Sequence, residues 1–247
     1  MPVKCELKFH DMPKDYPKDE VDVYRVVRAN NTVYFRLEFM GKPLYFTLSE
    51  QELVTHTRES LELFKELQPD DCSPVSVLRE AIYELIYLIG EKRNELYSTY
   101  EKLFEEAIIG KPIGGTEVVK LRKSAYQLFS DATVLYFVVR KLTKELGSNV
   151  EVDAKFALDR AELLITRLSD LYNIYYTRVQ YDLNDVIKKL TSVSILFLPI
   201  TAVASTYAVN FTSIAESLFT VDALVFLGPV FVFTAVIAYY LKRKGWL

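Results

Sequence analysis

Apolar residues are distributed so unevenly that the chain falls into an upstream part of mixed charge and a downstream part almost without charge. Residues 190–209 and 223–241 are runs of 20 and 19 residues with no charged side chain. As a helix, each run is long enough to cross the roughly 30 Å of a membrane's hydrocarbon core. We therefore expect two transmembrane helices forming a hairpin, with an outer loop at 210–222 and a basic tail at 242–247.

Upstream of the hairpin, short apolar stretches alternate with turn signals. The stretches at 21–27, 32–40 and 43–48 read as strands, and together they predict a small antiparallel sheet. Ser49 followed by Glu52 fits a capping box, which predicts a helix running from there toward residue 68.

Further helices are predicted from residue 73 to the chain's clearest breaker, the glycines around residue 110, and from about residue 116 to residue 147. The fold class that follows is α+β, with a cytosolic α/β domain at 1–149. This domain combines the small sheet with helices.

The helical pattern from residue 150 onward continues into the first apolar run without a cap or a break. From Glu151 to Tyr207 there are 57 residues, which correspond to about 85 Å of helix. Such a length is typical of a bundled stalk. We expect residues 150–189 to form the cytosolic part of this stalk and 190–209 its membrane-spanning part.

Basic residues flank the hairpin on both sides and set its expected orientation. They are Lys188 and Lys189 before the first run, and Lys242, Arg243 and Lys244 after the second. The positive-inside rule then predicts a multi-pass protein of the cell membrane with both termini in the cytoplasm. The N-terminal residues lack the apolar core of a signal peptide, which agrees with this expectation.

A row of polar residues follows the long helix at alternating steps of three and four. It consists of Asp170, Asn173, Thr177, Gln180, Asn184, Ile187, Thr191, Ser194, Leu198, Thr201 and Ser205, of which eight are polar and uncharged. Residues at this spacing lie on one face of a helix.

The row has two interpretations. Small hydroxyl residues also line dry contacts between membrane helices. The polar register, however, continues through the stalk, where a dry seam would require leucine or isoleucine, and this favours a water-lined pore. Ile187 and Leu198 would then be constrictions that close by losing water. One helix cannot enclose a channel, so this interpretation requires a homo-oligomer.

The stretch "NDVIKKLTSVSILFLPITAVASTYAVNF" and the final "KRKGWL" resemble the CorA family of divalent-cation channels, which transport magnesium. The resemblance implies a homopentamer with a cytosolic α/β domain, a pore lined by the long helix, and the second span outside it. The family signature after the pore helix is Gly-Met-Asn. In this chain Ala208, Val209 and Asn210 occupy those positions.

Carried over to this sequence, the resemblance places the selectivity site at the outer mouth, with Asn210, Tyr207 and Glu216. Magnesium keeps much of its hydration shell when it binds, so the amide oxygen of Asn210 would contact the metal through water. Glu216 is equally well explained as a solvated loop carboxylate. The expected pore-lining residues are Asn184, Ile187, Thr191, Ser194, Leu198, Thr201 and Ser205.

The function expected from these features is Mg2+ uptake through a homopentameric pore, with membrane lipid as the other partner. Ala208 and Val209 leave open a zinc, cobalt or nickel transporter of the same fold, and a non-conducting membrane-anchored regulatory subunit is a further alternative. No P-loop or HExxH motif is present, so we expect neither an enzyme nor a cofactor. The cysteines and histidines lack metal-ligand spacing, and no basic cluster suggests nucleic acid as a partner.

Overall fold

The structure is a computed structural model that describes residues 7–29, 31–64, 67–69, 71–210 and 221–246, with the backbone alone at 206–210 and 221–227. The chain divides into two compact units, Met1–Tyr175 and Tyr176–Leu247. The first unit contains a sheet and helices, and the second is helical. The α+β class expected from the sequence is confirmed.

The first unit contains a five-stranded sheet with the strand order β1-β5-β4-β3-β2. Its strands are β1 (Lys8–Phe9), β2 (Val26–Ala29), β3 (Thr32–Phe39), β4 (Lys42–Leu48) and β5 (Leu53–Thr55). The pairs β2–β3, β3–β4 and β4–β5 are antiparallel, but β1 pairs with β5 in parallel. The sheet is therefore mixed, and the expectation of a purely antiparallel sheet was wrong at this edge.

The strand predicted at 21–27 is a helix in its first half. Helix α1 spans Lys18–Tyr24 and ends at Arg25, whose left-handed backbone (φ 65°) turns the chain into β2. The prediction placed Val21 and Val23 on the same face of a strand. In the helix Val21 is fully buried while Val23 is 71% exposed. Two carboxylates in the first turn favour this helix start. The strand prediction did not use them, because it was based on the alternation of apolar and polar residues.

The helix predicted from Ser49 begins later in the chain. The hydrogen bond between Ser49 and Glu52, which was expected to cap that helix, stabilises a tight turn. The Ser49 hydroxyl accepts the N–H of Glu52 at 3.1 Å, and the Ser49 N–H donates to the Glu52 carbonyl at 2.9 Å. This turn joins β4 to β5, and the short helix α2 follows at Arg58–Leu63. A capping hydrogen bond alone does not distinguish a helix start from a tight turn.

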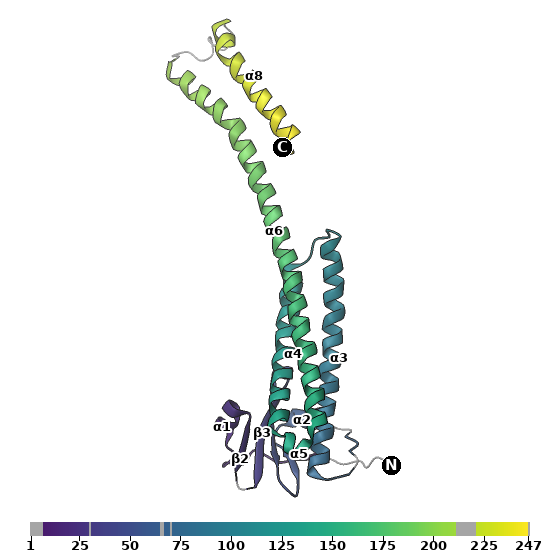
Figure 1. Ribbon diagram of the computed structural model, residues 1–247. Coiled ribbons are helices and arrows are strands. Elements are labelled where there is room, and N and C mark those ends of the chain that lie inside the picture. The colour runs from purple at the N-terminus through teal and green to yellow at the C-terminus, as the bar shows by residue number, and fades with distance from the viewer. Residues whose placement is uncertain (1–6, 30, 65–66, 70, 211–220, 247) are drawn as a thin grey trace. The chain divides into compact units, whose positions relative to one another are not determined.

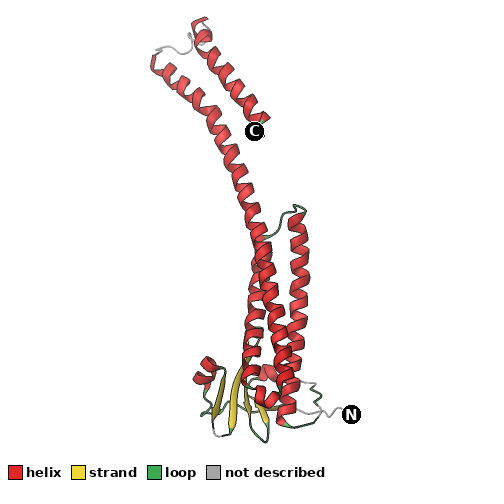
Figure 2. Cartoon of the chain, viewed as in Figure 1, coloured by secondary structure: helices red, strands yellow, loops and turns green. Residues whose placement is uncertain are grey.

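The longer helices agree well with the sequence prediction (Figure 2). Helix α3 (Pro74–Ile108) starts where the Ser73 hydroxyl accepts the N–H of Ser76 at 3.3 Å. Helix α4 (Gly115–Lys141) ends six residues before the predicted limit, and the short α5 (Thr143–Leu146) fills the remainder. Helix α6 spans Ser148–Asn210, and its 63 residues include Pro199.

The core of the first unit lies between the sheet and its helices. Phe35 on β3 and Phe46 on β4 are almost completely buried, and their rings stack with centroids 5.2 Å apart. Leucines and alanines of α3, α4 and the first part of α6 continue the same buried cluster. These helices run side by side from the sheet (Figure 1). The first part of α6 is thereby anchored along a three-helix bundle.

The second unit consists of the remainder of α6 and helix α8 (Val221–Arg243), which contains Pro229. The predicted apolar runs at 190–209 and 223–241 fall within these helices. In the part of the chain whose side chains are described, one helix, α6, is long and apolar enough to cross a membrane. The exact limits of both spans remain predictions.

Candidate functional site

The predicted pore-lining residues lie along the second-unit part of α6, and all of them are exposed in the single chain. Because the helix is continuous, their alternating spacing of three and four places them on one face. The two aliphatic members are among the more exposed, with Ile187 at 59% and Leu198 at 68%.

A different face of α6 is the covered one. Ser192 is buried, and Leu196, Pro199 and Val203 are half-buried at helical spacing. Helix α8 has a matching stripe that contains Val230, Thr234, Ile237, Ala238 and the buried Leu241. The two stripes indicate that the helices of this unit pack through them. The predicted pore-lining residues from Asn184 to Ser205 therefore lie outside this packed face.

Three hydroxyl groups in the row share one hydrogen-bond pattern. Ser194 donates to the carbonyl of the residue four positions earlier at 3.0 Å, Thr201 at 2.9 Å and Ser205 at 2.8 Å. A hydroxyl has one proton to donate and two lone pairs that accept. With the proton engaged by the backbone, each of these side chains offers the surrounding solvent an acceptor and no donor.

The predicted outer-mouth residues are only partly described. Asn210 is the last residue of α6, and Tyr207 lies one turn before it in the helix backbone. Their side chains and the whole of Glu216 lie outside the described residues. Their roles remain predictions.

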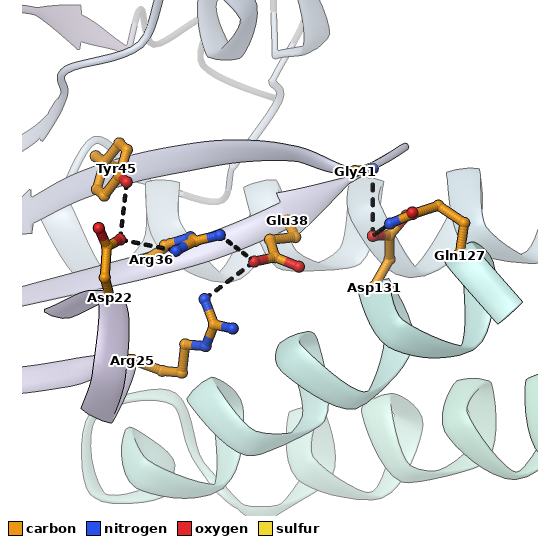
Figure 3. A network of polar contacts seen from close by, with 8 residues as sticks. All are labelled: Asp22, Arg25, Arg36, Glu38, Gly41, Tyr45, Gln127 and Asp131. Carbon is orange, nitrogen blue, oxygen red and sulfur yellow. Dashed lines mark hydrogen bonds and ion pairs between the residues drawn. The ribbon is translucent and has the colours of Figure 1, made fainter.

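A polar network in the first unit was not predicted (Figure 3). Arg36 on β3 pairs with Asp22 of α1 at 2.7 Å and also with Glu38, which Arg25 contacts at 3.0 Å. The Tyr45 hydroxyl donates to Asp22 at 2.8 Å. Burial would raise the pKa of Asp22, but the hydrogen bonds from Tyr45 and Arg36 outweigh it, and the pKa is lowered. These contacts hold α1 against the sheet.

A second unpredicted contact joins α4 to the hairpin between β3 and β4 (Figure 3). Asp131 is fully buried and accepts hydrogen bonds from the N–H of Met40 at 2.7 Å, the N–H of Gly41 at 3.4 Å and the Gln127 amide at 3.0 Å. Met40 and Gly41 have φ of 53° and 74°, as a two-residue type I′ turn requires. Burial raises the pKa of Asp131 despite these bonds. The sequence predicts a turn between the strands at 32–40 and 43–48, but not its partner on α4, 90 residues away.

The described residues contain no group of three or more histidine, cysteine, aspartate or glutamate side chains that could hold a metal ion. Within α6, Asp159 pairs with Lys155, and Asp185 pairs with Lys188 at 3.5 Å. The neutral acceptors shown on the described part of α6 are the hydroxyl oxygens of Ser194, Thr201 and Ser205.

Comparison with known proteins identifies the family of the chain. The family model described as "CorA-like Mg2+ transporter protein" matches residues 32–243. The cobalt/magnesium transport protein CorA of Thermotoga maritima is 26% identical over 235 residues, covering 83% of this chain and 67% of that protein. The magnesium transport protein CorA of Haemophilus influenzae is 30% identical over 191 residues, covering 72% of this chain and 61% of that protein. The chain thus spans about two thirds or less of the length of these relatives.

Two solved structures share the fold. The CorA magnesium transporter from Methanocaldococcus jannaschii superposes with a TM-score of 0.64 at 15% identity, covering 91% of this chain and 80% of that one. The ZntB cytoplasmic domain from Vibrio parahaemolyticus superposes with a TM-score of 0.51 at 10% identity, covering 68% and 81%. Since the family model matches most of the sequence, the chain belongs to the CorA-like Mg2+ transporter family, whose members are ion transporters and not enzymes.

Proposed function

We propose that the chain forms a homo-oligomeric pore, a pentamer as the resemblance implies, and conducts hydrated Mg2+ through a membrane into the cytoplasm. The observation that carries the proposal is the exposed polar row of α6, in which the hydroxyl protons of Ser194, Thr201 and Ser205 are bound to the backbone. Waters around a cation point their hydrogens outward, so a wall of acceptors suits a hydrated cation and disfavours a hydrated anion. In this proposal the row faces the symmetry axis.

The remaining predicted residues complete the path. Asn184 would supply an inner ring of amide oxygens, and Asn210 an outer ring that binds the hydration shell of Mg2+ without removing it. Tyr207 would support the outer ring, and Glu216 would attract cations to the mouth. Transport needs no ATPase, because a membrane potential of 100 mV contributes about 4.6 kcal/mol for a divalent ion.

The proposed orientation places the basic residues on both sides of the hairpin in the cytoplasm. Lys242 and Arg243 form the last turn of α8, and Lys188 and Lys189 lie on α6 just before the first apolar run. Short cytoplasmic flanks are enriched in such residues. Both chain ends would then lie on the inner side.

A flux measurement with two ions tests the proposal. The full chain is reconstituted in liposomes that contain a magnesium-sensitive dye, and a potential of about 100 mV, negative inside, is applied. We expect Mg2+ to enter at a rate that increases with the potential and to stay outside liposomes without protein. A correctly assembled oligomer that admits neither Mg2+ nor Zn2+ would instead support the non-conducting regulatory subunit.

Zinc transport is the second candidate, and the same measurement includes it. Ala208 and Val209 replace the family's Gly and Met at the outer mouth. Valine is stiff at χ1 where methionine adapts, so the ring at Asn210 could select a different ion. Zn2+ influx without Mg2+ influx would assign the chain to this candidate.

The constriction proposed at Leu198 gives a further prediction. Replacing Leu198 by serine should raise Mg2+ influx several-fold, because a hydroxyl keeps water in a narrow passage that leucine dries. The matched control is Ile200→Ser, which makes the same kind of change on the opposite face of α6. Equal influx in Leu198→Ser and the unchanged chain would show that the row does not line the path.

A further inference from the structure

Three arginines come together on the side of the first unit where α3 meets α6. The guanidinium carbon of Arg93 lies 4.6 Å from the centre of the Tyr97 ring, and that of Arg167 lies 5.4 Å from it. Arg167 also donates to the Tyr97 hydroxyl at 2.8 Å. Arg160 precedes Arg167 by seven residues, about two turns of α6, and therefore lies on the same face of that helix. We call Arg93, Arg160 and Arg167 the arginine cluster.

The positive charges of the arginine cluster are not balanced by ion pairs in the described part of the chain. None of its members forms an ion pair with a carboxylate in the described ranges. The Nε–H of Arg93 is buried and has no acceptor among the described residues. Burial lowers the pKa of Arg93, and the charges of Arg160 and Arg167 lower it further, although the nearby Tyr97 and Glu101 act in the opposite direction. Like charges that converge in this way are stabilised when an anion binds between them.

The neighbouring surface is open to a ligand. Gly90 lies about one turn before Arg93 on α3, and a Cβ placed there would meet no atom within 4 Å. Arg160 is exposed, and Arg93 and Arg167 are half-buried. Guanidinium groups from two helices, Arg93 of α3 and Arg167 of α6, therefore meet at the Tyr97 ring.

We propose that the arginine cluster binds a multivalent oxyanion of the phosphate class taken from solution. Guanidinium groups donate paired hydrogen bonds whose geometry matches phosphate oxygens. Arg93 uses one Nη on Asn94 and Arg167 uses one on Tyr97, and each has further N–H groups to donate. The bound anion would link α3 to α6. This site does not depend on the transport proposed above.

Titration calorimetry on the detergent-solubilised full chain tests the site, with inorganic pyrophosphate as the probe and no divalent cation present. We expect saturable binding of one pyrophosphate per chain. Replacing the exposed Arg160 by glutamine should weaken this binding about tenfold or more, because a charge-assisted pair of hydrogen bonds is lost. Without pyrophosphate, the thermal midpoint of Arg160→Gln should stay within about 2 °C of that of the unchanged chain, because Arg160 is exposed.

Arg122 provides a matched control on the other side of α6. Its guanidinium carbon lies 5.5 Å from the centre of the Tyr126 ring and 5.0 Å from the centre of the Tyr172 ring. Arg122→Gln removes the same charge and the same kind of ring contact, and should leave pyrophosphate binding unchanged. Equal weakening by both variants, or displacement of pyrophosphate by sodium chloride of equal ionic strength, would reduce the result to charge screening and overturn the proposal.

One further outcome would also overturn it. If Arg160→Gln reduces the oligomer to smaller species while the unchanged chain binds no pyrophosphate, the arginine cluster receives a carboxylate of a second copy of the chain. Light scattering on both proteins separates this outcome from binding of a dissolved anion.

Discussion

Replacing Asn210 by alanine is expected to reduce Mg2+ influx into liposomes by at least about tenfold. In the proposed pore this change removes one amide from every subunit at the same level, and each hydrogen bond to the hydration shell contributes about 1 kcal/mol. Several such losses together exceed the roughly 1.4 kcal/mol that corresponds to a factor of ten. Initial rates of dye fluorescence at matched protein content measure the effect.

Asn149→Ala is the control for this experiment. Asn149 lies exposed near the start of the same helix α6, so its replacement makes the same chemical deletion away from the proposed path. It should leave influx unchanged. If Asn210→Ala assembles normally and conducts Mg2+ as fast as Asn149→Ala, the outer ring does not meet the ion at this residue.

Replacing Asp131 by alanine is expected to lower the thermal midpoint of the first unit by about 6–12 °C. The carboxylate accepts the turn amides of Met40 and Gly41 and the side-chain amide of Gln127. Without it these three donors lose their acceptor, and at about 1 kcal/mol for each hydrogen bond the loss is about 3 kcal/mol in total. In a protein of this size each kcal/mol shifts the midpoint by about 2–4 °C. Thermal unfolding followed by circular dichroism measures the shift.

The effect of Asp131→Ala should depend on pH in a defined direction. Because burial raises the pKa of Asp131, the folded chain binds this proton more tightly than the unfolded chain. The contribution of Asp131 to stability is therefore complete below the ordinary carboxyl range and declines as pH rises toward the raised pKa. The difference between the two proteins should be larger near about pH 4 than at about pH 7.

Asp159→Ala serves as the control for the unfolding experiment on Asp131→Ala. Asp159 forms an exposed pair with Lys155 one turn away on α6, and such pairs contribute little to stability. Its replacement should shift the midpoint by no more than about 2 °C. A shift in Asp131→Ala as small as this would mean that the β3–β4 turn holds its shape without α4.

The long helices could be predicted because local signals determine them. Ser73 and Pro74 mark the start of α3, and the absence of any cap or breaker marks the continuity of α6. The failures occurred where one local signal fits two structures. Ser49 makes the hydrogen bond that is typical of a helix start, but it does so within a turn between two strands. The alternation at 21–27 predicted a strand, but the first part of this segment belongs to a helix that ends at Arg25.

Some features of the candidate site could be predicted from local signals in the sequence, and others could not. The polar row follows from spacing along one helix, so the sequence was sufficient to propose it. The contact of Asp131 with the β3–β4 turn and the arginine cluster each join residues far apart in the sequence. Neither has a motif of its own, because the partner of each side chain is decided by how the helices and the sheet pack. Only the structure brings these residues together.

Pro199 has a mechanical consequence for α6. Proline has no N–H, so the carbonyl of Ile195 lacks the amide partner that other turns of the helix provide. A helix bends most easily where such a bond is missing. Its stiffness is therefore lowest beside Leu198, and a small change in helix direction would move this side chain while Ile187, three turns earlier, keeps its place.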